Sequence, residues 1–317
     1  MVQVPLTDIR GGRGPEAVPR RHRMGRKKEL FWAVVFLLPA GLAIVSMRIA
    51  PALGAFWTSL HKGFPGGLKD PAFSGFENYV ALFTSPAFGE TVLRTVLFNV
   101  ILNPVQILIA LMLAVLMTRR LHLRGLWRIL LFVPATIPIV GSSIVWGIAM
   151  RPDGPLNAIL DALGLGRQPF LTSSTHALAS IMLVATWVGV GYWMLFLISG
   201  IEAIPDEYYE AARLDRAGPI RTFFHITLPM LKRPLLFVLV ADTVANFVLF
   251  VPIQMLTGGG PQNSTTMLMF DAYRTSYTYS DKNLGAAQVI VLTLIMLIFV
   301  AAQFALLRED EKGGRNG

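Results

Sequence analysis

Residues 210–218 read Glu-Ala-Ala-Arg-Leu-Asp-Arg-Ala-Gly, and residues 226–229 close the same segment with Ile-Thr-Leu-Pro. This polar, helix-forming segment stands between two strongly apolar runs, 178–200 and 235–256. A polar helical loop on one side of a membrane has no apolar surface of its own chain against which to pack. The segment therefore predicts a docking surface for a soluble partner.

The composition indicates a membrane protein. Of 317 residues, 54% are hydrophobic and only 15% are charged, whereas ordinary soluble domains carry about 25% charged residues. The chain has no cysteine, which excludes disulfides and cysteine-ligated metals. The net charge of +9 is assigned to lipid-surface contact and topology. It is not assigned to nucleic acid, because no basic folded face is left once the apolar runs are removed.

Six apolar runs are long enough to cross a hydrocarbon core, which is about 30 Å thick and needs roughly 20 helical residues. They are residues 30–50, 93–118, 129–150, 178–200, 235–256 and 285–307. Polar residues and Pro104 interrupt the second run, and Pro134 and Pro138 interrupt the third. Such interruptions are tolerated where neighbouring helices satisfy the freed backbone groups. The expected fold is therefore an all-α bundle of six transmembrane helices.

Lysine and arginine counts in the connections predict the orientation. The tail 1–29 has eight, the loop 119–128 four, the loop 201–234 five and the C-terminal tail three, while the three other loops have two each. The first set of connections holds twenty basic residues and the second set six. This difference places both termini and the loop 201–234 in the cytoplasm, an N-in and C-in arrangement. The predicted organisation is a disordered basic tail over 1–29, a six-helix transmembrane domain over 30–307 and a cytoplasmic tail over 308–317.

The tail 1–29 does not read as a secretory signal, because a long Gly/Pro/Arg-rich stretch precedes a full-length span. Its basic clusters at 20–23 and 26–28 are expected to bind anionic lipid headgroups, at about 1 kcal/mol per basic residue near the surface.

The loop 201–234 is predicted to hold two short helices on the membrane surface. Asp206 is expected to cap the first, and its acidic start favours the positive end of the helix dipole. Gly218 is expected to end this helix, Pro219 to begin the second and Pro229 to end it. Tyr208, Ala211, Ala212 and Leu214 form the modest apolar stripe expected on the first helix.

Two features of the first helix suit docking. The pair Ala211-Ala212 allows close backbone approach by another protein, and Glu210 supplies a negative charge for an arginine or lysine in a cleft. A generic surface helix shows the same features, so the pattern by itself leaves both interpretations open.

The spacing of the loop resembles the EAA loop of inner-membrane permease subunits of binding-protein-dependent ABC importers. The matched positions are Glu210, Ala211, Ala212, Ile226, Leu228 and Pro229. Residues common in the carbohydrate branch of that family are also present, namely Asp215, Ala217, Phe223 and Pro234.

The chain departs from the family pattern at the loop glycine, where it has Arg216. If that position needs a positive φ, arginine costs roughly 1 kcal/mol or more. Either Gly218 takes over the turn, or Arg216 adds its own contact to the ATPase.

Three further segments resemble the family in order and spacing, so that the likeness covers residues 28–307. They are Gly-Phe-Glu-Asn-Tyr at 75–79, Thr-Gly-Gly-Gly-Pro at 257–261 and Gly-Ala-Ala at 285–287. The chain thus resembles a permease of the sugar and glycerol-phosphate uptake branch, of the maltose-transporter type. That resemblance implies the type I importer permease fold and a bacterial inner-membrane location.

The resemblance also implies the partners: a second homologous permease, two ATPase subunits, and a periplasmic or lipid-anchored solute-binding protein. ATP closes the ATPase dimer, the docked loop moves with it, and the two permeases alternate between inward-facing and outward-facing states. No Gly-x-x-x-x-Gly-Lys-Ser/Thr motif is present. The chain is therefore expected to be non-catalytic and to bind no cofactor, with ATP and Mg on the partner ATPase. The expected coupling residues are Glu210, Ala211, Ala212, Asp215, Arg216, Ala217 and Gly218.

Polar residues inside spans are the default candidates for a solute path. A buried charge such as Asp242 costs roughly 2.5–3.5 kcal/mol on insertion scales, and aromatic planes can stack on sugar rings. The candidates are Asp242, Asn246, Asn103, Gln106, Asn99, Trp187 and Tyr192, with Trp146 and Trp193 as further aromatics and no metal ligand. Two other interpretations remain open: amides also bond across helices, and Trp and Tyr mark membrane interfaces.

Three further features receive assignments. Arg48, late in the first span, is expected to extend to the outer headgroups; the alternative is that it faces the vestibule or pairs with the binding protein. The loop 257–284, with three tyrosines, is either a contact for the binding protein or a plain solvated loop. Residues 156–163 predict a short amphipathic helix on the membrane surface, closed at Gly164.

Two other classes of function fit the sequence less well. A secondary transporter would show internal repeats and several charged pairs in its spans, whereas Asp242 is nearly alone at depth. A membrane-embedded enzyme would need a polar constellation, and the five histidines do not cluster. Glycerol-3-phosphate and neutral sugars or polyols both remain possible substrates. A phosphate site would favour a basic residue inside a span, and only Arg48 and Arg94 lie within or beside one. A neutral solute is therefore mildly favoured.

Overall fold

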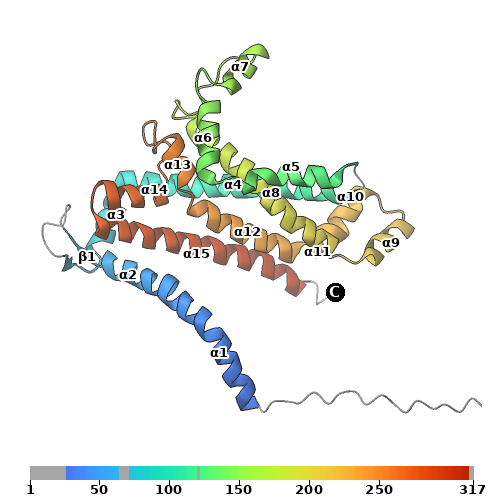
Figure 1. Cartoon of the computed structure of the whole chain (residues 1–317), viewed down its shortest axis with the longest axis horizontal. Coiled ribbons are helices and arrows are strands. Elements are labelled where there is room, and N and C mark those ends of the chain that lie inside the picture. Colours follow the sequence, from blue (N-terminus) through green and yellow to red (C-terminus); the bar gives the residue numbers. More distant parts are fainter. Residues whose placement is uncertain (1–25, 64–70, 120–121, 314–317) are drawn as a thin grey trace, which may run out of the picture. The chain divides into compact units, whose positions relative to one another are not determined.

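The structure is a computed structural model that describes residues 26–63, 71–119 and 122–313 (Figure 1). Most of the predicted tail 1–29 and the end of the tail 308–317 lie outside these residues. The chain divides into a unit that ends at Leu53 and a larger unit that begins at Gly54.

The first unit is helical throughout its described part. Helix α1 (Arg26–Ile44) runs through a π-helical turn η1 (Val45–Ile49) into α2 (Ala50–Ser59). The N–H of Ala50 donates to the carbonyl of Val45, five residues back, directly before Pro51. Because a proline ring presses on the carbonyl four residues earlier, a widened turn relieves that contact. Leu30–Ser59 is long and apolar enough to span a membrane.

Four more candidate spans belong to the larger unit: Pro86–Thr118, Ala177–Glu202, Lys232–Leu256 and Lys282–Leu306. They contain the helices α4 (Pro86–Thr118), α8 (Ala177–Glu202), α12 (Lys232–Phe247), α13 (Val251–Leu256) and α15 (Lys282–Gly313). Helices α4, α8 and α12 share a buried core in which fully buried Ala110 and Ala114 face larger residues such as Met194 and Leu197. Small residues let the helix backbones approach closely, as membrane bundles require.

The third predicted span is not one straight helix. Helix α5 (Arg124–Thr136) and helix α6 (Ile139–Ala149) meet at a bend of 96°, so the expectation of a continuous span over 129–150 is wrong in shape. The cause is Pro138, because the residue before a proline is pushed out of the helical region and Ile137 is extended at φ −78° and ψ 129°. Taken as one span, the bent pair brings the candidate spans in the described residues from five to six.

Short elements lie between the spans. They are β1 (His61–Lys62), β2 (Ala72–Phe73), α3 (Glu77–Thr84), α7 (Pro155–Ala162), α14 (Leu268–Tyr273) and the π-helical turn η3 (Arg274–Thr278). The two strands pair antiparallel, with His61 opposite Phe73. Helix α7 confirms the predicted short helix, and Gly164 closes it in the left-handed region at φ +73°.

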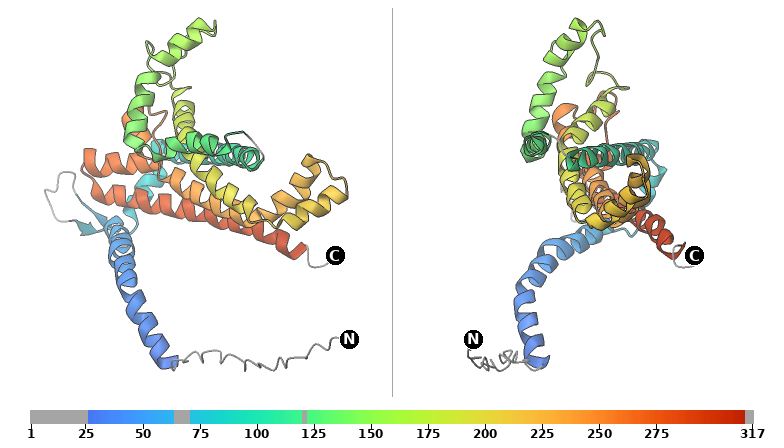
Figure 2. Two further views of the ribbon diagram at one scale, coloured as in Figure 1. Left: turned by 45° about the vertical axis from the view of Figure 1, so that its right-hand side comes forward. Right: turned by 90° about the vertical axis from the view of Figure 1, so that its right-hand side faces the viewer.

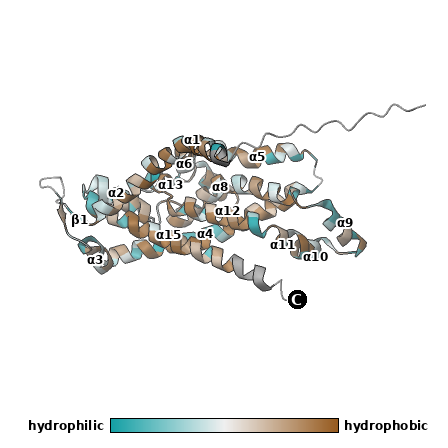
Figure 3. Cartoon of the chain, turned by 90° about the horizontal axis from the view of Figure 1, so that it is seen from below, coloured by the Kyte–Doolittle hydropathy of each residue, from teal (hydrophilic) through white to brown (hydrophobic). Residues whose placement is uncertain are grey.

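The connection between α8 and α12 folds into α9 (Asp206–Leu214), α10 (Pro219–Thr222), a π-helical turn η2 (Phe223–Thr227) and α11 (Leu228–Met230). Within the larger unit these elements lie at the same end as the C-terminal end of α15, and α3 and α14 lie at the opposite end (Figures 1 and 2). Coloured by hydropathy, the long helices are mostly apolar, whereas polar residues gather at α9 (Figure 3).

Candidate functional site

The first loop helix begins at Asp206. Pro205 is extended, at φ −58° and ψ 136°, and α9 follows directly. Asp206 lies inside the first turn and makes no side-chain capping bond, so the predicted cap is wrong. Asp206 and Glu207 nevertheless stand at the positive end of the helix dipole, which their charges favour.

The helix α9 ends in a Schellman turn built on Arg216. The N–H of Ala217 donates to the carbonyl of Ala212 at 2.8 Å, and the N–H of Arg216 donates to the carbonyl of Arg213 at 3.1 Å. This pair of bonds places the intervening residue in the left-handed region, and Arg216 has φ +51°. Gly218 is extended at φ −68°. The expectation that Gly218 ends the helix or takes over the turn is therefore wrong.

The second part of the loop begins at Pro219, as predicted, but Pro229 does not end it. The N–H of Leu228 donates to the carbonyl of Phe223, five residues back, so a widened turn again precedes a proline. The N–H of Leu231 then bonds the carbonyl of Thr227, and the N–H of Leu235 bonds that of Leu231. Pro229 is thus accommodated inside a helical path that continues into α12.

Tyr209 anchors the loop to its own chain. Its hydroxyl lies 3.1 Å from the hydroxyl of Thr227, and its ring packs with Phe223 against the core shared by α4, α8 and α12. Ala212, one helical turn on, is buried. Of the predicted stripe, Ala212 is buried, whereas Tyr208, Ala211 and Leu214 are exposed. The spacing of Tyr209 and Ala212 is the signal that would have located the buried side.

The predicted coupling residues divide between the surface and the interior. Glu210, Ala211, Asp215, Arg216 and Gly218 are exposed, Ala217 is partly buried and Ala212 is buried. Large apolar side chains are exposed beside them, with Leu214 at 85% and Ile220 at 75%. An exposed ion pair joins Glu210 and Arg213 at 3.7 Å. Pairs of this kind contribute little to stability, which leaves both charges available.

A groove of about 920 Å³ separates the loop from the C-terminal ends of α4 and α8. Its charged lining comes from Arg119, Glu202, Asp206 and Arg213, and its apolar lining includes Phe223 and Phe224. Beside it, Arg128 of α5 bonds the Glu202 carboxylate at 2.7 Å and the Met117 carbonyl at 3.1 Å. These two bonds tie α5 to α4 and α8 at the end where the loop attaches.

Five of the predicted path residues form a buried network inside the larger unit. The amide of Asn246 donates to Asn103 at 2.8 Å and to Gln106 at 3.3 Å. Asn99 and Asp242 are also buried, at 1% exposure each. Two further members of this network, Thr243 and Gln303, are not among the predicted residues. Thr243 accepts bonds from Asn103 at 3.0 Å and from Gln303 at 2.7 Å, which joins α4, α12 and α15.

Asp242 belongs to the same interior. Its Oδ1 accepts a bond from the indole N–H of Trp193 at 2.7 Å, whereas its Oδ2 has no hydrogen-bond partner. Trp193 thus joins α8 to α12. The other aromatic candidates lie elsewhere: Trp187 meets Trp146 edge to face at 5.5 Å, and Tyr192 is exposed beside Phe196.

Residues 106–308 match the model of a family described as the binding-protein-dependent transport system inner membrane component. The chain belongs to this family. Three relatives illustrate its breadth. The sulfoquinovosyl glycerol transport system permease protein SmoG of Agrobacterium fabrum is 32% identical over 88% of this chain and 91% of its own. The trehalose/maltose transport system permease protein MalF of Thermococcus litoralis is 29% identical over 83% of this chain and 89% of its own. The sn-glycerol-3-phosphate transport system permease protein UgpA of Pectobacterium atrosepticum is 32% identical over 85% of this chain and 92% of its own.

Solved structures agree on the fold. A chain of a bacterial ABC transporter for the acidic polysaccharide alginate superimposes with a TM-score of 0.72 at 21% identity, over 89% of this chain and 96% of that one. The predicted type I importer permease fold, the family and the multi-pass inner-membrane location are confirmed. The chain is a transport permease of the binding-protein-dependent ABC class, which is favoured over a secondary transporter.

Proposed function

We propose that this permease imports a sugar or sugar-like solute and that its loop 201–234 is coupled to a separate ATPase chain. The substrate class rests on the relatives, whose printed names concern sulfoquinovosyl glycerol, trehalose and maltose, and glycerol-3-phosphate. The coupling role rests on one observation above the others: α9 and α10 expose Leu214 and Ile220 beside charged residues. Exposed apolar side chains on a polar loop are typical of a protein contact.

The orientation belongs to the same proposal. The basic connections favour the cytoplasm for both termini and for the loop 201–234. Within the larger unit, the loop and the C-terminal end of α15 share one end of the bundle (Figure 2), which agrees with that count. The loop then faces the compartment that holds ATP.

The loop is built to pass a force to the spans. Tyr209 and Thr227 join α9 to η2. The path from η2 through α11 crosses a single turn residue, Leu231, into α12, and main-chain bonds at Leu231 span that turn. Ala212 is buried. Arg128 and Glu202 tie α5 to the end of α8. A pull on α9 therefore moves α8, α12 and α5 together, which suits alternation between inward-facing and outward-facing states.

The remaining partners follow from the class. A second homologous permease, two ATPase subunits that bind ATP and Mg, and a periplasmic or lipid-anchored solute-binding protein complete the importer. The apolar window of α15 is only 11% buried inside this chain, which leaves a face for the second permease or for lipid. Because the sequence holds no Gly-x-x-x-x-Gly-Lys-Ser/Thr motif, the nucleotide is assigned to the ATPase chains.

The polar network has a defined place in this scheme. Asp242, Asn246, Asn103, Asn99 and Gln106 are buried between α4 and α12, so they contact a solute only in a state where these helices part. Trp187 and Tyr192 are more accessible. In the closed arrangement the amides bond across the helices, as polar groups in membrane bundles do.

A reconstitution experiment tests the proposal. The permease, its partner permease and its ATPases are placed in liposomes with the solute-binding protein, and uptake of labelled maltose and sn-glycerol-3-phosphate is followed with and without ATP. ATP-dependent uptake of maltose is expected. Uptake that persists without ATP but follows an ion gradient would contradict the proposal. Glycerol-3-phosphate is the second candidate because UgpA matches the chain at the same 32% identity as SmoG.

A further inference from the structure

Helix α3 carries an exposed apolar stripe at the end of the larger unit opposite α9 (Figure 1). Phe76, directly before the helix, and Val80 and Phe83 within it are 67%, 61% and 70% exposed. Residues three or four positions apart lie on one face of a helix, so these side chains form a single stripe. Asn78 and Leu82 lie on another face of the helix and are buried.

The buried face of α3 is fastened to the end of the first candidate span. The Nδ2 group of Asn78 donates to the carbonyl oxygens of Ser59 and His61, each at 2.8 Å. The hydroxyl groups of Tyr79 and Ser59 lie 2.6 Å apart. The span Leu30–Ser59 ends at the residue that takes part in two of these bonds. Because α3 cannot turn about its axis without breaking them, the direction of its stripe is fixed.

Two other candidate spans begin beside α3. The span Pro86–Thr118 starts two residues after Thr84, the last residue of the helix. Asn283 is the second residue of the span Lys282–Leu306, and its Nδ2 group donates to the carbonyl of Thr58 at 3.0 Å. Three apolar spans therefore begin or end around α3, which places this helix at the boundary of the hydrocarbon core.

Aromatic side chains mark the same boundary. Trp57 is exposed in the last turn of the first span, and its ring lies 4.9 Å from that of His61. The His61 ring in turn meets the exposed ring of Phe73 edge to face at 5.5 Å. Tryptophan is enriched at membrane–water interfaces because its ring is amphipathic. An exposed tryptophan at this level agrees with the position of α3.

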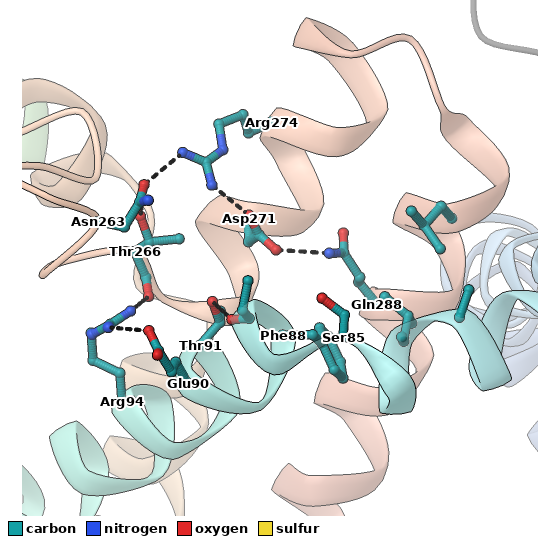
Figure 4. Close-up of a pocket in the computed structure, with 14 residues that line it drawn as sticks. Ser85, Phe88, Glu90, Thr91, Arg94, Asn263, Thr266, Asp271, Arg274 and Gln288 are labelled. Atoms are coloured by element: carbon teal, nitrogen blue, oxygen red, sulfur yellow. Dashed lines mark hydrogen bonds and ion pairs between the residues drawn. The ribbon is translucent and has the colours of Figure 1, made fainter.

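The polar groups behind α3 bond one another and not the stripe. Helices α3, α4, α14 and α15 line a cavity of about 330 Å³ (Figure 4). In its wall Arg274 and Gln288 both donate to Asp271 at 2.8 Å, and Arg94 donates to the carbonyl of Thr266 at 3.2 Å. None of the three stripe residues lines this cavity. The stripe therefore forms a surface of its own.

We propose that α3 lies in the headgroup boundary of the membrane leaflet remote from α9, with Phe76, Val80 and Phe83 among the lipid acyl chains. The charged side of the helix stays in water, where Glu77 and Lys62 form an exposed ion pair at 3.3 Å. A helix with one apolar and one charged face binds a membrane surface in this way. Lipid is favoured over a protein partner because the stripe carries no charge and a span begins directly after it. The inference goes beyond the proposed function and does not depend on the solute.

The test uses the assembled transport complex, with cysteine-free partner chains, in vesicles of phosphatidylethanolamine and phosphatidylglycerol. This chain has no cysteine, so the single variants Val80→Cys, Phe83→Cys and Glu77→Cys each accept one nitroxide spin label. Electron paramagnetic resonance compares how often each label collides with oxygen, which concentrates in lipid, and with a water-soluble nickel chelate. Glu77→Cys is the matched control, because it is exposed on the same helix and its ion pair contributes little to stability.

The ratio of oxygen to nickel collisions is expected to be severalfold higher at positions 80 and 83 than at position 77, with and without the solute-binding protein. The inference is overturned if the nickel chelate reaches position 80 as readily as position 77, which places the stripe in water. It is also overturned if both reagents are excluded from positions 80 and 83, which indicates a covering protein. An equally high ratio at position 77 would contradict it too, since the whole helix would then be immersed in hydrocarbon. Failure of the proposed function reads out separately, as absence of ATP-driven uptake by the unaltered complex.

Discussion

The main-chain N–H of Ala217 donates to the carbonyl oxygen of Ala212 over 2.8 Å, and this bond closes the helix that we propose docks the ATPase. This closure places Arg216, the residue directly before Ala217, in the left-handed region at φ +51°. Glycine would adopt this conformation without strain. The turn therefore keeps its geometry although its residue is the costlier one, and it presents an exposed guanidinium group at the tip of α9.

Arg216→Gly should stabilise the turn. Removing the side chain relieves roughly 1 kcal/mol of left-handed strain, which corresponds to about fivefold slower exchange of the amide hydrogens of Arg216 and Ala217. Hydrogen exchange by mass spectrometry on the peptide that spans α9 measures this. Arg216→Val is the opposing control, since a β-branched residue is strained further in this region. Faster exchange in Arg216→Gly would show that the side chain itself holds the turn.

Tyr209→Phe should loosen the attachment of α9 to η2. The variant loses the 3.1 Å hydroxyl contact with Thr227 and keeps the packed ring, at a cost of about 1 kcal/mol. Exchange of α9 amides should rise severalfold, and ATP-driven uptake should fall more than ATP hydrolysis does. The control is Tyr208→Phe, one position earlier on an exposed side chain, which should change neither. Equal effects of the two variants would argue against an anchoring role.

These positions show which parts of the molecule can be predicted from the sequence. The short helix closed at Gly164 was predicted correctly because an apolar pattern ended at a glycine, a local signal. The same reasoning predicts the wrong residue in the loop. Gly218 is the nearest glycine, but the bonds that close α9 place Arg216 in the left-handed position. The bend at Pro138 was not predicted, because hydropathy gives the length of an apolar run and says nothing about the direction of the helix axis within it.

Contacts between residues far apart in the sequence were also not predicted. Asn103 and Asn246 were both named as polar residues at depth, but their mutual bond joins positions 143 residues apart. Thr243 and Gln303 carry no special signal in the sequence, and they matter only because α12 and α15 bring them together. The cavity at Gln288 likewise depends on four helices, none of which predicts it by itself.

Gly191→Ala should separate α5 from α8. A methyl group at Gly191 would collide with the main-chain carbonyl of Leu131 and the Cα atom of Phe132, which cannot rotate away. Overpacking of this kind costs typically 1–3 kcal/mol, and thermal denaturation of the purified complex should show a lower midpoint. Gly125→Ala on α5 is the control, because nothing lies within 4 Å of the added methyl group. A midpoint equal to that of the control would contradict the close approach of the two helices.

Glu210→Lys should uncouple the importer without unfolding it. The carboxylate is exposed and its pair with Arg213 is long, at 3.7 Å, so the stability change should stay within about 0.5 kcal/mol. ATP-driven uptake should fall by tenfold or more while the protein remains inserted. Uptake and ATP hydrolysis are measured on the same proteoliposomes. The control is Glu207→Lys, another exposed acidic residue one helical turn earlier. Unchanged uptake in Glu210→Lys would remove this residue from the docking surface.

Asp242→Asn separates the two roles open to the buried network. Asparagine keeps the oxygen that accepts the Trp193 N–H at 2.7 Å, and its amide group replaces the carboxylate oxygen that has no partner. The variant should therefore assemble with its ATPases, while solute uptake changes if Asp242 contacts the solute path. Asp242→Leu is the contrast, because it leaves the buried indole N–H unpaired at a cost of about 1–3 kcal/mol.

The measurements for Asp242 are ATPase co-purification, the thermal midpoint of the complex and the KM for uptake. Asp242→Leu and Trp193→Phe should each lower the midpoint, and the double variant Asp242→Leu/Trp193→Phe should lose less than their sum, because the two residues share one bond. A changed KM in Asp242→Asn with an unchanged midpoint supports a path residue. If Asp242→Asn instead loses assembly to the same extent as Asp242→Leu, the carboxylate holds α8 and α12 together and has no separate part in transport.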